Sequence, residues 1–153
     1  MQMDLSSKAG VGRLRRGFTL AEVVISAAIA AISIGGIMYG YVLSAQRAEW
    51  ASYAMAAQSL AMQRIEQTRS ARWDLSATPT VDELDPVNFP AQINVLDIPI
   101  SGTNVVFATN FTTITTLSTA PPLRSIQVDC VWRWSVGNRL FTNTVTTYRA
   151  TDD

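Results

Sequence analysis

The length, composition and charge of this chain exclude several classes of function. Its 153 residues suffice for one domain, 48% of them are hydrophobic, and equal numbers of basic and acidic residues give zero net charge. The chain has no histidine, one cysteine and one lysine, so the usual zinc-ligand sets, the Ser-His-Asp triad, the Cys-His pair and an intrachain disulfide are all absent. Carboxylate or Ser-Lys catalysis stays open, but the one lysine is Lys8, near the N-terminus. We therefore expect no catalytic site, no metal site and no cofactor.

The chain begins with a basic segment, residues 1–17, which precedes a long apolar run. Its basic residues are Lys8, Arg13, Arg15 and Arg16, and its only acidic residue is Asp4. Residues 23–43 then carry no charge over 21 positions, and about 20 apolar residues span the hydrocarbon core of a bilayer as a helix. Basic residues before such a helix favour a cytoplasmic N-terminus. The sequence thus predicts a single-pass membrane helix whose following residues lie on the other side.

The chain after residue 17 is mildly acidic. Removing four of the 12 basic and one of the 12 acidic residues leaves eight against eleven. Nucleic-acid binding depends on neutralising phosphates with basic side chains. We therefore expect no nucleic-acid partner.

Two kinds of export signal fit the N-terminus poorly. A secretory signal peptide would be cleaved near the small residues 27–31, but the apolar run continues to Leu43 and Glu22 interrupts its start. A twin-arginine signal would use Arg15 and Arg16, but Leu14 stands where Ser or Thr is usual and no good cleavage site follows.

A third kind of signal fits better. The sequence Arg15-Arg16-Gly17-Phe18-Thr19-Leu20-Ala21-Glu22, followed directly by the apolar run, resembles the type III leader of type IV pilins and type II secretion pseudopilins. The resemblance implies that a prepilin peptidase cleaves between Gly17 and Phe18 and methylates the new amine of Phe18. It also implies that Glu22 pairs with the Phe18 amine of a neighbouring subunit and sets the register of assembly. The alternative is that Glu22 lies at headgroup depth and reaches water.

The helix is expected to continue well beyond the membrane. No proline occurs between Phe18 and Leu75, and residues 44–73 are rich in good helix formers. One face of this segment is mostly apolar and small, and we expect it to pack on a sheet. Its members are Trp50, Tyr53, Ala54, Ala57, Leu60, Ala61 and Ile65, with Ala51, Met55 and Met62 at the margin. Residues 46–73 also loosely resemble the helix of minor pilins of the V type and of minor pseudopilin I.

The segment after the helix, residues 76–92, reads as an irregular connection. It contains three prolines and the acidic residues Asp82, Glu83 and Asp85. These carboxylates could bind calcium, but their spacing matches no calcium loop. A solvated acidic loop is the favoured interpretation.

Four antiparallel strands are predicted in the remainder of the chain. The ranges 93–98, 105–116, 124–136 and 139–148 are rich in β-branched and aromatic residues and are separated by Ser101-Gly102, Pro121-Pro122 and Gly137-Asn138. The third strand alternates clearly, and its inward residues are predicted to be Ile126, Val128, Cys130, Trp132, Trp134 and Val136. Cys130 is interpreted as a buried apolar residue, with a reactive thiol as the alternative. The two tryptophans are interpreted as core residues, with a sugar-binding platform as the alternative.

These observations combine into one prediction. The fold class is α+β, with a long N-terminal helix packed on a small antiparallel sheet: residues 1–17 form the leader, 18–43 the membrane or fibre-core helix, 44–75 its amphipathic continuation and 76–153 the β-rich head. The resemblance implies a non-enzymatic minor pilin or pseudopilin of the inner membrane with a periplasmic head. Its partners would be prepilin peptidase, other pilins or pseudopilins and an inner-membrane assembly platform. The alternative is a periplasmic binding module held by an uncleaved helix.

Overall fold

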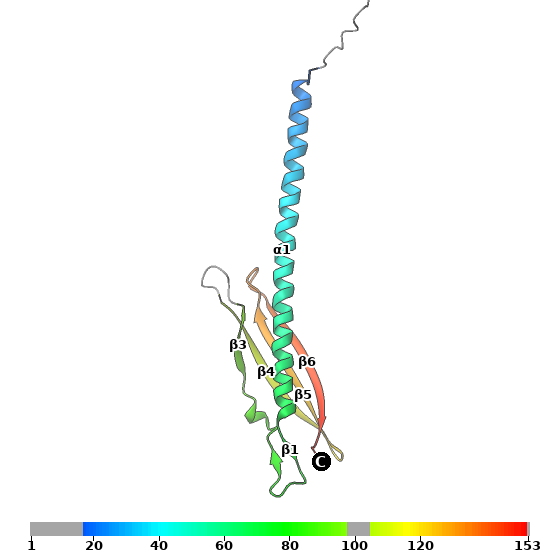
Figure 1. The fold of residues 1–153 in the computed structure, drawn as a ribbon, viewed down its shortest axis with the longest axis vertical. Coiled ribbons are helices and arrows are strands. Elements are labelled where there is room, and N and C mark those ends of the chain that lie inside the picture. The colour runs from blue at the N-terminus through cyan, green and yellow to red at the C-terminus, as the bar shows by residue number, and fades with distance from the viewer. Residues whose placement is uncertain (1–16, 98–104, 153) are drawn as a thin grey trace, which may run out of the picture. The chain divides into compact units, whose positions relative to one another are not determined.

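The computed structural model describes residues 17–97 and 105–152, and the chain divides into two compact units, one up to Ser44 and one from Ala45 onward. In chain order the elements are α1 (Leu20–Ser70), β1 (Trp73–Asp74), β2 (Val81–Asp82), the 3-10 helix η1 (Pro86–Asn88), β3 (Gln92–Asp97), β4 (Val106–Thr119), β5 (Pro122–Arg133) and β6 (Leu140–Ala150). The predicted α+β class, a long apolar N-terminal helix followed by antiparallel sheets, is confirmed (Figure 1).

The helix α1 runs without interruption for 51 residues. It begins two residues after Phe18 and ends three residues before Trp73, close to the predicted limits. The segment contains no proline, so no backbone N–H is missing from the helical hydrogen bonds. The single acidic residue of its first turn is Glu22 and the single basic residue of its last turn is Arg69, the arrangement that the helix dipole favours.

The four long strands form one antiparallel sheet in the order β3-β4-β5-β6. This is a meander, because each strand pairs with its neighbour in sequence. The turn between β5 and β6 needs two left-handed residues, and it places Gly137 at φ 84° and Asn138 at φ 56°. The predicted turn at Ser101-Gly102, like residue 98 at the end of the first predicted strand, lies outside the described residues.

Within the second unit, the C-terminal part of α1 lies across one face of this sheet (Figure 1). The helix contributes Tyr53, Ala57, Ala61 and Ile65 to the core, four residues of the predicted face. Alanines at two of these positions let the helix approach the sheet closely. Trp50 is still 40% exposed, yet its ring contacts Trp132, with 6.3 Å between the centroids.

Alternation along β5 places its inward side chains in this core. Ile126, Val128, Cys130, Trp132 and Trp134 are all buried, as predicted. Val136 was predicted to join them, and that prediction is wrong: its side chain is 46% exposed. The reason is that β5 ends at Arg133, so the two-residue period no longer governs the chain at position 136.

The connection after α1 is more ordered than its composition predicts. Here β1 pairs with β2, η1 follows, and two side chains of the segment, Leu84 and Phe89, enter the core. Arg64 of α1 covers the Phe89 ring at 5.3 Å and donates hydrogen bonds to Thr112 Oγ1 and the Pro90 carbonyl. Arg64 thereby joins the helix, the connection and β4.

Polar side chains of β5 and β6 complete the attachment. Asn143 accepts a hydrogen bond from Trp132 Nε1 at 2.9 Å and donates to the Ala54 carbonyl at 3.2 Å. Arg149 donates to the Thr68 carbonyl at 2.8 Å, which satisfies one of the carbonyls left open at the end of α1. Between Ala54 and Thr68, α1 is therefore fixed to the sheet by hydrogen bonds as well as by apolar packing.

Candidate functional site

The predicted cleavage junction lies immediately before the helix. Gly17, Phe18 and Thr19 are exposed and have no helical structure, and α1 begins at Leu20. The Phe18 side chain is 81% exposed. The peptide bond between Gly17 and Phe18 is consequently free of helical hydrogen bonds and open to an approaching enzyme.

The side chain of Thr19 caps the helix. Its Oγ1 accepts a hydrogen bond from the Glu22 backbone N–H at 3.2 Å, and its carbonyl accepts the first helical bond, from the Val23 N–H, also at 3.2 Å. These are the two contacts of an N-cap residue. The sequence interpretation missed this role, although a threonine followed three residues later by a glutamate is a known signature of a helix start.

Glycine at position 17 is not required by the packing of the described part of the chain. A Cβ built on Gly17 would have no heavy atom within 4 Å. A side chain at position 17 would therefore clash with none of the described residues. A requirement for glycine would have to come from a partner outside them. An enzyme that must bring its catalytic groups to the Gly17 carbonyl would provide such a requirement.

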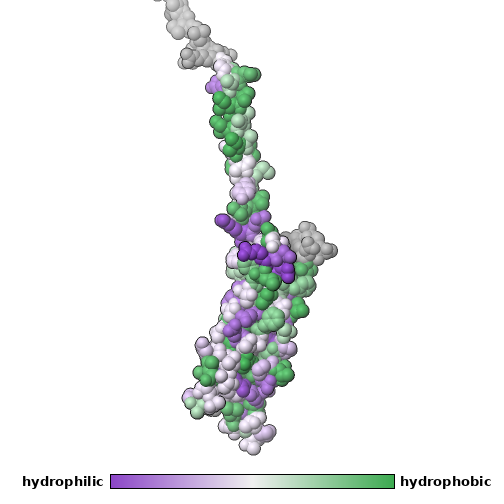
Figure 2. Space-filling view, turned by 180° about the vertical axis from the view of Figure 1, so that it is seen from behind, coloured by the Kyte–Doolittle hydropathy of each residue, from purple (hydrophilic) through white to green (hydrophobic). Residues whose placement is uncertain are grey.

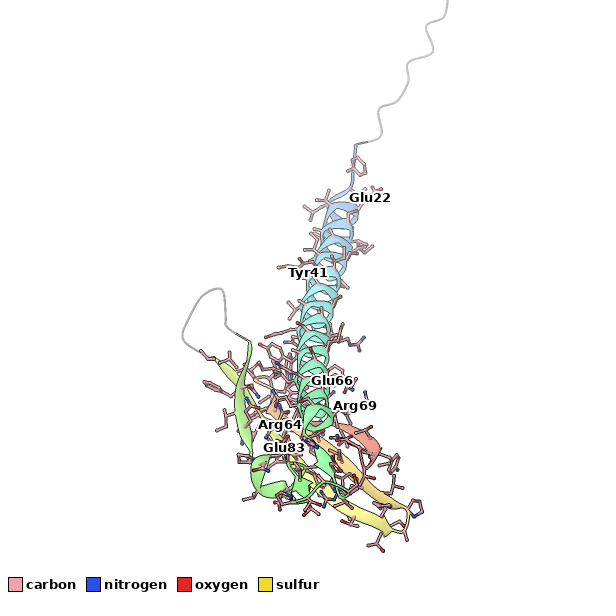
Figure 3. All side chains as sticks on the ribbon, turned by 60° about the horizontal axis from the view of Figure 1, so that its bottom comes forward. Glu22, Tyr41, Arg64, Glu66, Arg69 and Glu83 are labelled. Carbon is pink, nitrogen blue, oxygen red and sulfur yellow. The ribbon has the colours of Figure 1, made fainter. Side chains whose placement is uncertain are left out.

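Glu22 projects from the first turn of α1 (Figure 3). Among the residues that the structure describes, none of the ion pairs involves its carboxylate. The positive end of the helix dipole favours an anion there by several tenths of a kcal/mol. Placing the carboxylate inside a bilayer costs about 2.5–3.5 kcal/mol, so the dipole alone does not compensate for that transfer.

The first unit buries almost none of its apolar surface. In this part of α1 every residue is exposed except Leu43, which is half-buried, and Figure 2 shows mostly apolar side chains on its visible face. In the described residues, α1 is the one helix long and apolar enough to cross a membrane. A Cβ at Gly35, Gly36 or Gly40 would also meet nothing within 4 Å. Such small residues allow another helix to approach closely.

The three leader arginines of the prediction, Arg13, Arg15 and Arg16, lie outside the described residues. Of the predicted site residues, the structure therefore describes only Gly17, Phe18 and Glu22. It adds Thr19 to them. These four residues lie within six positions of sequence at one end of a helix.

The acidic residues of the connection take separate local roles. Asp82 accepts two hydrogen bonds from Arg124, Glu83 accepts one from the Arg72 backbone N–H, and Asp85 caps η1 through the Val87 N–H. Over the described residues, no group of three or more His, Cys, Asp or Glu side chains is placed to hold a metal ion. The three carboxylates predicted to form a solvated loop thus make one ion pair, one hydrogen bond with a backbone N–H and one helix cap.

Two other candidates in the head belong to the core. Trp132 and Trp134 are buried with their rings 6.5 Å apart and stand among other aromatic rings, which confirms the core interpretation over a sugar platform. Cys130 is fully buried, and burial raises the pKa of its thiol to about 11. At neutral pH the thiol is therefore protonated and unreactive.

Comparison with known proteins identifies the junction. Residues 12–38 match the family model described as the prokaryotic N-terminal methylation motif, which is the leader motif of type IV pilins and pseudopilins. The match includes Gly17, Phe18, Thr19 and Glu22. No curated protein and no solved structure matches the chain. The motif implies processing by a prepilin peptidase and assembly with other pilins, and the apolar helix agrees with membrane anchoring.

Proposed function

We propose that this chain, which carries the leader motif of type IV pilins and pseudopilins, is a minor pilin or pseudopilin. It would be a structural subunit of a type IV pilus or a type II secretion pseudopilus, without a reaction of its own. The observation that carries the proposal is the match over residues 12–38, coupled to a helix that begins two residues after the predicted cleavage bond.

Processing is the first step of the proposed role. Prepilin peptidase adds water across the Gly17–Phe18 peptide bond, which leaves a carboxylate on Gly17 and an amine on Phe18, and that amine is then methylated. The exposed, non-helical backbone of these two residues supports the step. Because the cut precedes the apolar run, the whole membrane-spanning segment stays on the mature protein.

Membrane residence is the second step. The basic leader favours a cytoplasmic N-terminus, so the second unit, from Ala45 onward, would lie in the periplasm. The exposed apolar surface of the first unit requires a nonpolar environment, and a bilayer of about 30 Å supplies it for a helix of this length. When the subunit leaves the membrane, the helices of neighbouring subunits would cover the same surface.

Assembly is the third step, and Glu22 is its central residue. The carboxylate has no ion pair within the described residues and is expensive in a membrane, so a cation from a neighbour would stabilise it. We assign that role to the Phe18 amine of the adjacent subunit. Each subunit would then be recruited at a defined axial position by the inner-membrane platform.

The features of the head support a minor subunit. Cys130 is buried and is the single cysteine of the chain, so the disulfide-bounded C-terminal loop of many major type IV pilins cannot form. The loose resemblance of residues 46–73 to minor pilins of the V type and minor pseudopilin I also supports a minor subunit. Whether the machine is a pilus or a secretion apparatus is decided by partners rather than by these residues.

Substitution of Glu22 tests this proposal. The change Glu22→Gln should leave cleavage intact but reduce incorporation into fibres at least ten-fold, measured as the fraction of chain in sheared filaments of a strain that produces the other subunits. Glu66→Gln is the matched control, since Glu66 is exposed on the same helix and its ion pair within the described residues is with Arg69. Equal incorporation of the Glu22→Gln variant and the wild type would contradict the assembly role.

A further inference from the structure

The helix start and the cleavage bond are coupled through one side chain, that of Thr19. We infer that Thr19 is a positioning residue for prepilin peptidase: by capping α1, it keeps the Gly17–Phe18 bond outside the helix. The inference rests on the proposed processing of the chain and adds a specificity-determining residue to it.

The coupling follows from the hydrogen bonds at this end of the helix. In a continuous helix, the Glu22 N–H would bond to the carbonyl four residues earlier, that of Phe18. In the structure it bonds to Thr19 Oγ1 at 3.2 Å instead. The threonine hydroxyl therefore replaces the Phe18 carbonyl as acceptor, and the helix stops there.

Extension of the helix by a second residue, past Phe18, would bring the Gly17 carbonyl into the helical hydrogen bonds. The Ala21 N–H would then bond to the Gly17 carbonyl, which is the carbonyl that the peptidase must attack. A carbonyl held in that way is turned along the helix axis and surrounded by side chains. The cap prevents this arrangement, and Gly17, Phe18 and Thr19 stay exposed and non-helical.

The cleavage rate should therefore depend on the residue at position 19 in the order in which residue types cap a helix. Ser, Asn and Asp cap well, Thr and Gly follow closely, and Ala caps poorly while being the best helix former. This order differs from the one expected if the peptidase bound the threonine hydroxyl directly. In that case Ser would be accepted, whereas Asn and Gly would be rejected with Ala.

The test uses the full-length chain in nanodiscs and purified prepilin peptidase, with initial cleavage rates taken from intact mass. Thr19→Ser and Thr19→Asn should be cut within about two-fold of the wild-type rate, and Thr19→Gly slightly more slowly. Thr19→Ala should be cut about five-fold more slowly, the factor that corresponds to losing a typical cap. Ser26→Ala, which removes an exposed hydroxyl from the same helix, should leave the rate unchanged.

A second measurement requires no cleavage. Carbonyl and Cα chemical shifts of chain labelled with ¹³C at Gly17 and Phe18 should move toward helical values in Thr19→Ala, and stay at wild-type values in Thr19→Asn. Equal rates for all variants, rejection of Asn and Gly together with Ala, or unchanged shifts in Thr19→Ala would each overturn the inference. Failure of the peptidase to cut the wild-type chain would instead refute the proposed processing, and the chemical shifts would still decide the capping role.

Discussion

Replacing Arg124 should destabilise the head more than replacing any exposed arginine. Its guanidinium makes two hydrogen bonds of 2.7 Å to the Asp82 carboxylate, donates to the Leu84 carbonyl at 3.0 Å and lies 4.4 Å from the centroid of the Trp73 ring. The Arg124 side chain is only 17% exposed. It therefore holds β2, the buried Leu84 and Trp73 of β1 against β5.

The size of the effect follows from these contacts. A hydrogen bond to a charged group contributes about 1.5–3 kcal/mol, and a cation over an aromatic ring at a partly buried position adds about 1 kcal/mol. Since Asp82 is partly exposed, the lower values apply, and Arg124→Ala should lower the free energy of unfolding by about 2–3 kcal/mol. Arg124→Lys keeps the charge but loses the planar fork, so we expect about half that loss.

Urea unfolding of the full chain in detergent, followed by tryptophan fluorescence, measures this difference. All four tryptophans lie in the second unit, so the signal reports the unfolding of that unit. Arg139→Ala is the control, because Arg139 is exposed and has no ion pair among the described residues. A loss below about 0.5 kcal/mol for Arg124→Ala, the range of an ordinary surface substitution, would refute the reasoning.

The pH dependence provides a second check on the same contact. Hydrogen bonds from Arg124 hold the pKa of Asp82 below its ordinary value of 3.8. A carboxyl group whose pKa is lowered in the folded state contributes stability that is present above its unfolded pKa and is lost as the pH falls through the folded one. The advantage of the wild type over Arg124→Ala should therefore be constant above about pH 5 and shrink below about pH 4.

Three further predictions concern the core. Asn143→Ala should cost about 2 kcal/mol by leaving the buried Trp132 N–H unpaired, which urea unfolding would show; a neutral result would contradict this account of the contact. Ala57→Leu, at a position with no exposed surface, should cost about 1–3 kcal/mol or more through overpacking, whereas Ala51→Leu on the exposed side should be tolerated in the same assay. Cys130, with its pKa raised to about 11, should resist iodoacetamide at pH 8 until urea unfolds the head, and labelling of the native chain at the rate of a free thiol would argue against its burial.

The long elements of this fold could be predicted from the sequence because each repeats a pattern many times. The helix carries 51 residues without proline, and β4, β5 and β6 have 14, 12 and 11 residues. Over such lengths the apolar period and the turn residues specify the element and its approximate ends. The alternation failed at Val136, where the strand had already ended.

The short elements could not be predicted for the opposite reason. β1 and β2 have two residues each and η1 has three, which is too few to show a period. Their order depends on contacts distant in sequence, such as the ion pair of Asp82 with Arg124 and the bond from Trp73 N–H to Asp152 at 2.9 Å. Proline and acidic residues indicated a loop, but nothing local revealed that Leu84 would be fully buried.

The candidate site likewise contains residues that could be identified from the sequence and one whose role was missed. Gly17, Phe18 and Glu22 could be selected from the sequence because they form a compact motif beside an apolar run. The capping role of Thr19 had a local signal, a threonine three residues before a glutamate, and the structure establishes it by the helix start at Leu20 and the bond from the Glu22 N–H to Thr19 Oγ1.

The N-terminus of the mature chain tests the central claim most directly. The full-length protein would be produced with and without a prepilin peptidase, and the membrane-fraction product would be sequenced from its N-terminus by mass spectrometry. The proposed function predicts a peptidase-dependent product that begins at methylated Phe18. A chain that keeps Met1 with the peptidase present, or one that is cut near Ala31, would contradict the pilin assignment and favour a head tethered by an ordinary anchor.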